Sequence, residues 1–369
     1  MSERNLSAIV LAAGAGTRMR SSRPKPLHLL AGRAMLRYVL DSLADCSVEQ
    51  VVVVVGHGAE RETKKLQGEE LDLAVTFVEQ HTQDGTGDAA SVGLTGLPDD
   101  DGPESEHHDV LVLPGDMPLL RPATIAALVD AHRAADAACT VLTARVPDPG
   151  NYGRVVRGKD GQVVRIVERA DASDEEAEID EINTAVYCFR RSVLAPALRR
   201  ITPANAQGEY YLTDVVAVLR EAGYSVGAVV VPDAAEAEGI NDRLQLAAAE
   251  AEIRRRTNER WLQAGVTLVD PANTYLDATV QLGPDVTLFP GTILQGSTVV
   301  GAGAEIGPNT RLVDCVIGAG AVVEQSNGRD AEVGADAKVG PFAVLAPGAS
   351  VADGAVTGPF FVAAGPDDT

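Results

Sequence analysis

The chain has 369 residues, of which 45% are hydrophobic and 23% charged, so it is long enough for about two globular domains with substantial cores. Its formal net charge of −22 argues against nucleic acid and anionic membranes as partners, because both require a basic face. The N-terminus lacks the order of a signal peptide and no apolar run reaches the length of a membrane span, so the sequence predicts a cytoplasmic protein.

The first predicted element is a buried strand over Ser7–Leu11, followed by a loop of small residues from Ala12 to Gly16. Small residues let backbone N–H groups approach a ligand closely, and a phosphate fits such a loop. No acidic residue occurs between Arg4 and Leu40, although the chain as a whole is strongly acidic. The same stretch carries the cations Arg18, Arg20, Arg23, Lys25, Arg33 and Arg37. Local charge therefore opposes global charge, as a site for an anionic ligand requires.

Two common nucleotide-binding motifs do not fit this loop. A dinucleotide-binding fingerprint needs a third glycine where Met19 stands, and a P-loop needs Gly-Lys followed by Ser or Thr. The pattern L-A-A-G-x-G-T-R-M over 11–19, followed by P-K-P-L over 24–27, instead resembles the signature of sugar-nucleotide pyrophosphorylases. The continuation L-H-L-L-A-G-R-A-M-L is similar to the uridylyltransferase half of the bifunctional N-acetylglucosamine-1-phosphate uridyltransferase/glucosamine-1-phosphate acetyltransferase family.

This resemblance implies roles for the residues of the loop. It assigns nucleotide binding to the loop residues Leu11, Ala12, Ala13 and Gly14, and catalysis on the phosphates to Arg18 and Lys25. A glycine-rich turn with surface cations is the simpler alternative.

Residues 7 to about 145 alternate short apolar runs with helical patterns, which is typical of a parallel sheet covered by helices. The predicted strands are Ser7–Leu11, Gln50–Val55, Leu73–Val78, Asp109–Leu113 and Ala138–Arg145. The predicted helices are Met35–Ala44, Ala59–Gln67, Thr86–Leu94 and Thr124–Ala134. We therefore expect an α/β fold, a Rossmann-like nucleotidyltransferase domain whose mostly parallel sheet carries helices on both faces and binds ligands beyond the carboxyl ends of its strands.

Candidate ligands of a nucleotide follow the third and fourth predicted strands. The resemblance implies that Gln80, Gly85 and Thr86 bind the uracil nucleotide, and an amide side chain suits the donors and acceptors of an imide edge. Pro114, Gly115 and Asp116 end the fourth strand and are assigned to the nucleotide in the same way.

The resemblance also implies a magnesium site formed by Asp116 and Asn241. Carboxylate and amide oxygens suit Mg²⁺, which takes few protein ligands and completes its shell with water and phosphate oxygens. Asp116 could instead be a turn or capping aspartate, and Asn241 could be the N-cap of a helix predicted from Asp242 to Ala264.

Strand-rich patterns follow over Tyr152–Arg157, Val163–Glu168 and Glu181–Phe189. Within them Gly153, Glu168 and Asn183 match the family's contacts to the acceptor sugar. A carboxylate and an amide suit sugar hydroxyls, and a glycine lets the backbone face an N-acetyl group. The segments N-A-Q-G-E-Y-Y-L-T-D over 205–214 and E-A-E-G-I-N-D-R-L-Q-L over 236–246 continue the match.

A six-residue apolar repeat begins at Leu276 and predicts a parallel β-helix of about four or five coils. The repeat runs through Leu276, Leu282, Leu288, Leu294, Val300, Ile306 and Leu312, shifts register to Ile317 and Val323, and returns at Val333, Val339, Leu345 and Val351. We predict a nucleotidyltransferase domain over 1–240, a connecting helix over 241–264, a truncated left-handed β-helix over 265–361 and a tail over 362–369. In the resembled family such a β-helix forms homotrimers.

Residues of the resembled acetyltransferase site are replaced in this chain. Ala346 stands where relatives carry an arginine, and Gly365 stands near the position of a lysine. We therefore expect acetyltransferase activity to be absent, and a naturally short protein.

Together these patterns predict an enzyme that forms UDP-N-acetylglucosamine and pyrophosphate from UTP and N-acetylglucosamine 1-phosphate with Mg²⁺. The alternatives are the same chemistry on another sugar 1-phosphate or nucleotide, and a trimeric scaffold without catalysis. The four cysteines are widely separated and form no C-x-x-C pair, so neither zinc nor a disulfide is expected.

Overall fold

The computed structural model describes residues 4–14, 16–56, 73–98 and 107–365. The chain divides into two compact units, which are treated separately. The first unit consists of Met1–His28 and Ala34–Gln245, and the second of Leu29–Arg33 and Leu246–Thr369. The predicted helix Ala59–Gln67 lies outside the described residues.

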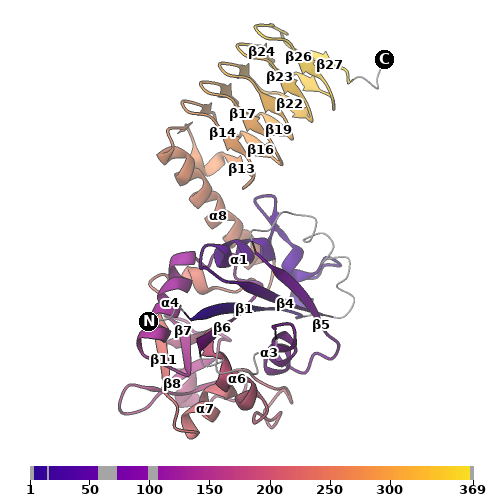
Figure 1. Cartoon of the computed structure of the whole chain (residues 1–369). Coiled ribbons are helices and arrows are strands. Elements are labelled where there is room, and N and C mark those ends of the chain that lie inside the picture. Colours follow the sequence, from indigo (N-terminus) through magenta and orange to yellow (C-terminus); the bar gives the residue numbers. More distant parts are fainter. Residues whose placement is uncertain (1–3, 15, 57–72, 99–106, 366–369) are drawn as a thin grey trace. The chain divides into compact units, whose positions relative to one another are not determined.

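The first unit is built on a mixed sheet whose main path runs in the order β11-β7-β10-β6-β1-β4-β5 (Figure 1). Neighbouring strands on this path are parallel except for β10, which is antiparallel to both β6 and β7. The strands are β1 (Asn5–Ala12), β4 (Gln50–Gly56), β5 (Val75–Gln80), β6 (His108–Pro114), β7 (Cys139–Arg145), β10 (Glu181–Arg190) and β11 (Val226–Val230), with β8 (Arg154–Arg157) and β9 (Val163–Val167) added beside β10. A short pair, β2 (Leu29–Leu30) and β3 (Arg33–Ala34), forms a separate sheet.

Both faces of this sheet are buried, because alternate residues of each central strand enter different cores. On β1, Ile9 packs in one core, whereas Ala8 and Val10 pack in the other. The first core includes residues of α3, α6 and α7, and the second includes residues of α1 and α4. The α-helices of this unit are α1 (Met35–Ala44), α3 (Thr86–Thr95), α4 (Pro122–Ala134), α5 (Asp174–Ala177), α6 (Arg191–Leu198) and α7 (Asp214–Glu221). The 3₁₀ helices are η1 (Thr17–Met19), η2 (Lys25–Leu27) and η4 (Ala234–Ala237). The predicted α/β fold with helices on both faces is confirmed.

Several predicted boundaries shift by one or two residues. The strand expected from Tyr152 begins at Arg154, because the Tyr152 N–H bonds to the carbonyl oxygen of Pro149 (3.1 Å) and closes a turn first. The helix expected from Thr124 begins at Pro122, where proline suits the first helical turn. The strand expected from Leu73 begins at Val75.

Helix α8 (Arg243–Gln263) agrees closely with the predicted connecting helix. Its N-terminal amides at Leu244 and Gln245 donate to Oδ1 of Asp242 (2.9 Å each), so Asp242 caps the helix. The proposed alternative of Asn241 as the N-cap is therefore wrong, and the Asn241 amide oxygen is available for another role.

The second unit is a β-helix of three parallel sheets, with six strands in one and five in each of the others (Figure 1). It is consistent with the expected left-handed parallel β-helix. Its strands are β12 (Thr267–Leu268), β13 (Tyr275–Leu276), β14 (Gln281–Leu282), β15 (Thr287–Leu288), β16 (Ile293–Gln295), β17 (Val299–Val300), β18 (Glu305–Ile306), β19 (Arg311–Val313), β20 (Val316–Ile317), β21 (Val322–Val323), β22 (Asn327–Arg329), β23 (Glu332–Val333), β24 (Lys338–Val339), β25 (Val344–Leu345), β26 (Ser350–Val351) and β27 (Val362–Ala363). A 3₁₀ helix, η5 (Pro271–Asn273), joins β12 to β13.

Each apolar residue of the predicted repeat is the second residue of a strand. The missing repeat position between Val323 and Val333 is filled by the buried Gly328, which pairs with Leu312 and Leu345 in neighbouring strands. The register shift is thus a shortening of individual turns, and the stacking of strands continues through it.

The hairpin Leu29–Arg33 belongs to the second unit although its flanking residues belong to the first. Within that unit the Ala31 N–H donates to Oε2 of Glu250 (2.8 Å), and the Ala278 N–H donates to the Ala31 carbonyl (2.9 Å). No periodicity in the sequence indicates this association. All four cysteines are free thiols, and none of the helices in the described residues is both long and apolar enough to cross a membrane.

A buried charge cluster anchors the start of β6. Asp109 is fully buried, and its carboxylate lies 2.9 Å from Nε of Arg133, 3.5 Å from Nε2 of His132 and 3.7 Å from Nη1 of Arg4. Burial by itself raises the pKa of Asp109, but the contacts with His132 and Arg133 outweigh it, so the pKa lies below the ordinary value.

We expect Asp109→Asn to lower the free energy of unfolding by about 3 kcal/mol at pH 7, because the substitution leaves the partly buried guanidinium groups of Arg4 and Arg133 without their counter-charge. The folded pKa of Asp109 is depressed, so its contribution is present above the unfolded pKa of about 3.9 and disappears as pH falls through the folded value. Urea unfolding between pH 7 and pH 3 measures this, and the wild-type and Asn curves should converge at low pH. A constant difference across that range would contradict the electrostatic explanation.

Candidate active site

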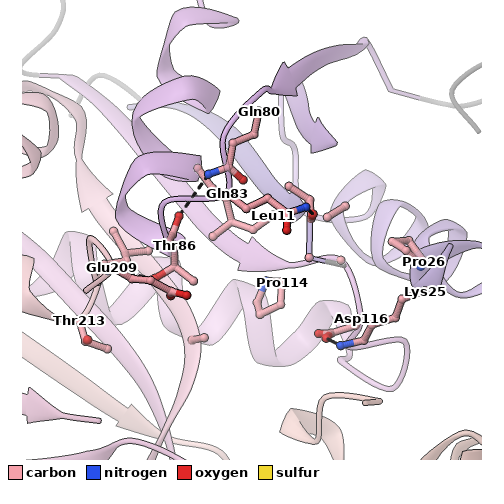
Figure 2. A pocket seen from close by; sticks show the side chains of 18 of the residues that line it. Leu11, Lys25, Pro26, Gln80, Gln83, Thr86, Pro114, Asp116, Glu209 and Thr213 are labelled. Carbon is pink, nitrogen blue, oxygen red and sulfur yellow. Dashed lines mark hydrogen bonds and ion pairs between the residues drawn. The ribbon is translucent and has the colours of Figure 1, made fainter. Parts of the chain in front are cut away.

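A cavity of about 450 Å³ opens in the first unit at the carboxyl ends of β1, β5 and β6 (Figure 2). This is where ligands bind in sheets of this type. Its walls come from five parts of the chain: Leu11, Ala12, Ala13, Gly14, Lys25 and Pro26; Gln80, Gln83, Gly85, Thr86 and Ala89; Pro114, Gly115 and Asp116; Glu168, Asn183, Ala185 and Tyr187; Glu209, Leu212 and Thr213.

The loop after β1 is held by residues that follow β6 and β5. The Gly115 N–H donates to the Leu11 carbonyl (2.8 Å), and Nε2 of Gln83 donates to the Ala13 carbonyl (2.5 Å). Gly56 leaves room for this contact, since a Cβ there would lie 2.9 Å from the Ala13 oxygen. No role was predicted for Gln83 from the sequence, although it lies between Gln80 and Gly85, which the resemblance assigns to the nucleotide.

Four polar side chains from distant parts of the chain meet at one end of the cavity. Nζ of Lys25 contacts Oδ2 of Asp116 (Figure 2) and donates to Oδ1 of Asn241 (2.8 Å). Nη2 of Arg18 donates to the same Asn241 oxygen (2.9 Å). The backbone supports this meeting, because the Ile240 N–H donates to the Asp116 carbonyl (3.0 Å).

The donor set of Asp116 and Asn241 fits a divalent cation. One ammonium group touches an oxygen of each residue, so a single small cation at that position would reach both. Within the described ranges no group of three or more His, Cys, Asp and Glu side chains is arranged to hold a metal. A cation held by one carboxylate and one amide would therefore keep sites for water and phosphate oxygens, which is the coordination that Mg²⁺ favours.

Gln80 is buried at the end of β5, and one end of its amide is already occupied. Its Nε2 donates to Oδ2 of Asp88 (2.7 Å) and, at 3.3 Å, to the Gly85 carbonyl. Among the described residues these bonds use only the nitrogen, so Oε1 can accept a hydrogen bond from a ligand. Asp88 thus orients the Gln80 amide.

Gly153, Glu168 and Asn183, which the resemblance assigns to the acceptor sugar, lie close to one another. The Asn183 N–H donates to the Gly153 carbonyl (2.9 Å), and a Cβ on Gly153 would lie 3.4 Å from Oε2 of Glu168. Burial raises the pKa of the Glu168 carboxyl.

The structure brings nearly all predicted site residues to this cavity. Those outside its lining are Arg18, Gly153 and Asn241, and each contacts a neighbour of the site. The lining also contains Gln83, Tyr187, Glu209 and Thr213, which were not predicted individually. Glu209 and Thr213 belong to the 205–214 segment that matched the family, so the signal existed without an assigned role.

The segment that carries Glu209 and Thr213 docks on the loop before α3 through main-chain atoms. The Gly87 N–H donates to the Tyr210 carbonyl and the Tyr210 N–H to the Asp84 carbonyl (2.7 Å each). The Leu212 N–H donates to Oγ1 of Thr86 (3.0 Å). Gly85 and Gly87 permit this approach, since a Cβ on either would lie within 3.0 Å of the Tyr210 backbone.

Comparison with known proteins identifies two levels of similarity. Residues 8–213 match the family model of the MobA-like NTP transferase domain. Curated relatives named bifunctional protein GlmU include those of Corynebacterium aurimucosum (46% identical over 332 residues, 89% of this chain and 67% of the relative) and Heliobacterium modesticaldum (45% over 328 residues, 89% and 69%). The relative of the same name from Thermobifida fusca is 46% identical over 332 residues, 90% of this chain and 68% of the relative. The chain thus spans about two thirds of the length of these relatives.

We expect Gly85→Ala to loosen the docked segment, because its Cβ would lie 2.6 Å from the Tyr210 carbonyl oxygen and the residue has a φ of +112°. Overpacking of about 1–3 kcal/mol predicts amide exchange at Gly87 and Tyr210 that is faster by roughly 5- to 150-fold. Hydrogen exchange read by mass spectrometry measures it. Gly208→Ala is the matched control, with a φ of +70° and no atom within 4 Å of the added Cβ. Equal exchange in both variants would show that close packing at Gly85 is not what holds the segment.

Proposed function

Because the chain belongs to the GlmU family of sugar-1-phosphate nucleotidyltransferases, we propose that it is a uridylyltransferase. The proposed reaction forms UDP-N-acetylglucosamine and pyrophosphate from UTP and N-acetylglucosamine 1-phosphate. The observation that carries the proposal is the single cavity in which the loop after β1, Lys25 with Asp116, and Glu168 with Asn183 face one another. These groups suit a nucleotide, its phosphates and a sugar respectively.

The proposed reaction is an in-line attack of the sugar phosphate oxygen on the α-phosphorus of UTP. That oxygen is already anionic, so no general base is needed, and the protein has to align the reactants and neutralise charge. We propose that Lys25 and Arg18, which both donate to the Asn241 amide oxygen, stabilise the departing pyrophosphate.

Magnesium is the proposed metal, with Asp116 and Asn241 as its protein ligands. When bound, it would neutralise phosphate charge at the reacting centre. With a metal held by Asp116 and Asn241, the Lys25 ammonium, which touches both residues here, would be free to bind the phosphates of the nucleotide.

The proposed base and sugar contacts follow from which atoms remain available. Oε1 of Gln80 is an acceptor, which suits the imide N–H of uracil. Glu168 accepts and the Asn183 amide donates at the sugar end, which suits a sugar that carries both hydroxyl and acylamino groups. Gly153 lies against both of these residues and keeps space for the substituent.

The β-helix is proposed to form a homotrimer. Its outer surface carries exposed apolar side chains, including Val316 (51% exposed), Phe342 (50%) and Phe360 (73%), and the two phenylalanine rings stack with centroids 5.2 Å apart. Exposed apolar groups of this kind favour association with further copies.

The relatives carry the word bifunctional in their names. We propose that this chain lacks acetyl transfer, because Ala346 and Gly365 replace the charged residues that the resemblance assigns to that reaction.

The test is pyrophosphate release from UTP with Mg²⁺, comparing N-acetylglucosamine 1-phosphate, glucosamine 1-phosphate and glucose 1-phosphate. Preference for the N-acetylated sugar would support the full proposal. Release with another sugar or another nucleotide would keep the mechanism and overturn the assigned specificity. Release of coenzyme A from acetyl-CoA with glucosamine 1-phosphate would overturn the proposed loss of acetyl transfer.

We expect Lys25→Met to lower kcat by about 10²- to 10³-fold, the usual effect of removing one group that stabilises transition-state charge. The methionine keeps most of the apolar stem, so the melting temperature should change little. Lys159→Met, in the turn between β8 and β9, is the matched control and should keep wild-type turnover. Wild-type turnover in Lys25→Met would refute the catalytic assignment.

Metal removal should abolish turnover, and added Mg²⁺ should restore it.

Asp116→Asn should raise the dissociation constant for Mn²⁺, measured by electron paramagnetic resonance with UTP present, by tenfold or more, because a charged ligand is lost. Asp45→Asn, at the C-terminal end of α1, removes the same charge outside the cavity and should leave it unchanged. Unaltered Mn²⁺ affinity in Asp116→Asn would remove Asp116 from the metal site.

A further inference from the structure

Two hydroxyl groups in the cavity bind to protein side chains that face the proposed sugar. Oγ1 of Thr213 donates to Oε1 of Glu168 (3.1 Å), and Oη of Tyr187 accepts from Nδ2 of Asn183 (2.8 Å). Thr213 is 4% exposed and Tyr187 1% exposed, so water does not compete strongly for either contact.

The position of Thr213 in the fold makes its contact with Glu168 informative. Thr213 is the N-cap residue of α7, where a threonine side chain ordinarily accepts from the backbone of the first helical turn. Here the side chain makes no capping bond and turns to Glu168 instead. The Thr213 hydroxyl therefore donates to the Glu168 carboxylate in the cavity and does not cap α7.

Thr213 is also held firmly with respect to the nucleotide end of the cavity. The preceding residues dock on the loop before α3 through the bonds between Leu212 and Thr86 and between Tyr210 and both Asp84 and Gly87. These hydrogen bonds restrict the movement of the segment that carries Thr213, so its hydroxyl is held beside Glu168.

The Ala185 N–H determines which end of the Asn183 amide faces Tyr187. Oδ1 of Asn183 accepts from the Ala185 N–H (3.1 Å), which only an oxygen can do, so Nδ2 must be the end that faces Tyr187. The second hydrogen on Nδ2 remains for a ligand. The local backbone supports this geometry, since a register shift in β10 between Asn183 and Val186 brings Ala185 to a φ of +61°.

We propose that Thr213 and Tyr187 are positioning residues, which hold Glu168 as an acceptor and Asn183 as a donor for the sugar part of the substrate. The inference rests on the proposed function for the identity of that substrate. These two residues contact Asn183 and Glu168, the side chains proposed to bind the sugar, and take no direct part in phosphoryl transfer.

The charge of Glu168 makes its dependence on Thr213 measurable. Burial raises the pKa of Glu168, the Thr213 hydrogen bond lowers it, and the nearby carboxylates of Asp214, Asp171 and Glu209 raise it. Tyr187 is neutral here, because burial holds the pKa of its phenol well above 10. Loss of the Thr213 hydroxyl therefore has to raise the pKa of Glu168, whereas loss of the Tyr187 hydroxyl removes only a neutral partner from Asn183.

The experiment compares Thr213→Val and Tyr187→Phe, each of which removes one hydroxyl at nearly constant shape. Both should raise KM for the sugar phosphate by roughly tenfold while KM for UTP changes less than twofold. In Thr213→Val the pH below which sugar KM rises should move upward, and in Tyr187→Phe it should stay in place. Thr213→Ser should restore wild-type values, because it returns the hydroxyl. Thr95→Val and Tyr224→Phe make the same chemical changes at exposed positions outside the cavity and should change nothing.

A second readout does not depend on turnover. The pKa of Glu168, measured by NMR on protein with ¹³C-labelled glutamate carboxyls and assigned with Glu168→Gln, should rise in Thr213→Val and return in Thr213→Ser. An unchanged Glu168 pKa with unchanged sugar KM would overturn the inference. Equal rises of both KM values with a lowered melting temperature would also overturn it, since they would indicate a general structural defect. If the wild type transfers to no N-acetylated sugar while the Glu168 pKa shifts as expected, the proposed substrate fails and the positioning role stands.

Discussion

The parallel pairing of β1 with its two neighbours is the constraint on which the site depends. β1 lies between β4 and β6, and its register with β6 pairs Leu11 with Pro114, so the two strands end side by side. The loop after β1 and the turn that carries Asp116 therefore begin at the same edge of the sheet. The bond from Gly115 to the Leu11 carbonyl joins the two segments directly. Both faces of β1 are buried, which prevents a slip of register. A slip by one residue would move each apolar side chain into the core on the opposite face of the sheet.

Charge is distributed unevenly in this molecule, and the site shows why that distribution is useful. The chain as a whole carries a net charge of −22, yet Arg18 and Lys25 converge on one acidic and one amide side chain. Around Glu168 the balance is reversed, and Asp171, Glu209 and Asp214 surround a carboxylate with like charges. The two ends of the cavity thus differ in the charge of the side chains around them.

The amide side chains in this site are oriented by hydrogen bonds to other protein groups. Asp88 occupies the nitrogen of Gln80, and Ala185 occupies the oxygen of Asn183. Each amide is left with one kind of atom for a ligand, so an ambiguous side chain becomes a definite acceptor or donor. Such preorganisation lowers the cost of ordering side chains when a ligand binds.

Features that depend on neighbouring residues along the chain could be predicted from the sequence. Alternating apolar runs predicted the strands and helices of the sheet, six-residue spacing predicted the β-helix, and the motif after the first strand indicated a nucleotide loop. It also identified most of the residues that line the cavity, through their place after strands and through the family resemblance. Boundaries were less secure, as at Tyr152, where a turn bond competes with strand pairing.

The contacts between residues far apart in the chain could be identified only from the three-dimensional structure. The contacts of Lys25 with Asn241 and of Thr213 with Glu168 join segments that share no local pattern. The same is true of the hairpin Leu29–Arg33, which is bonded to Glu250 in the second unit. Periodicity reports which face of an element is buried, whereas the partner of a polar group depends on how strands and loops far apart in the chain are placed. That placement is set by the packing of the whole unit, so the roles of Asp88, Tyr187 and Thr213 became visible only in three dimensions.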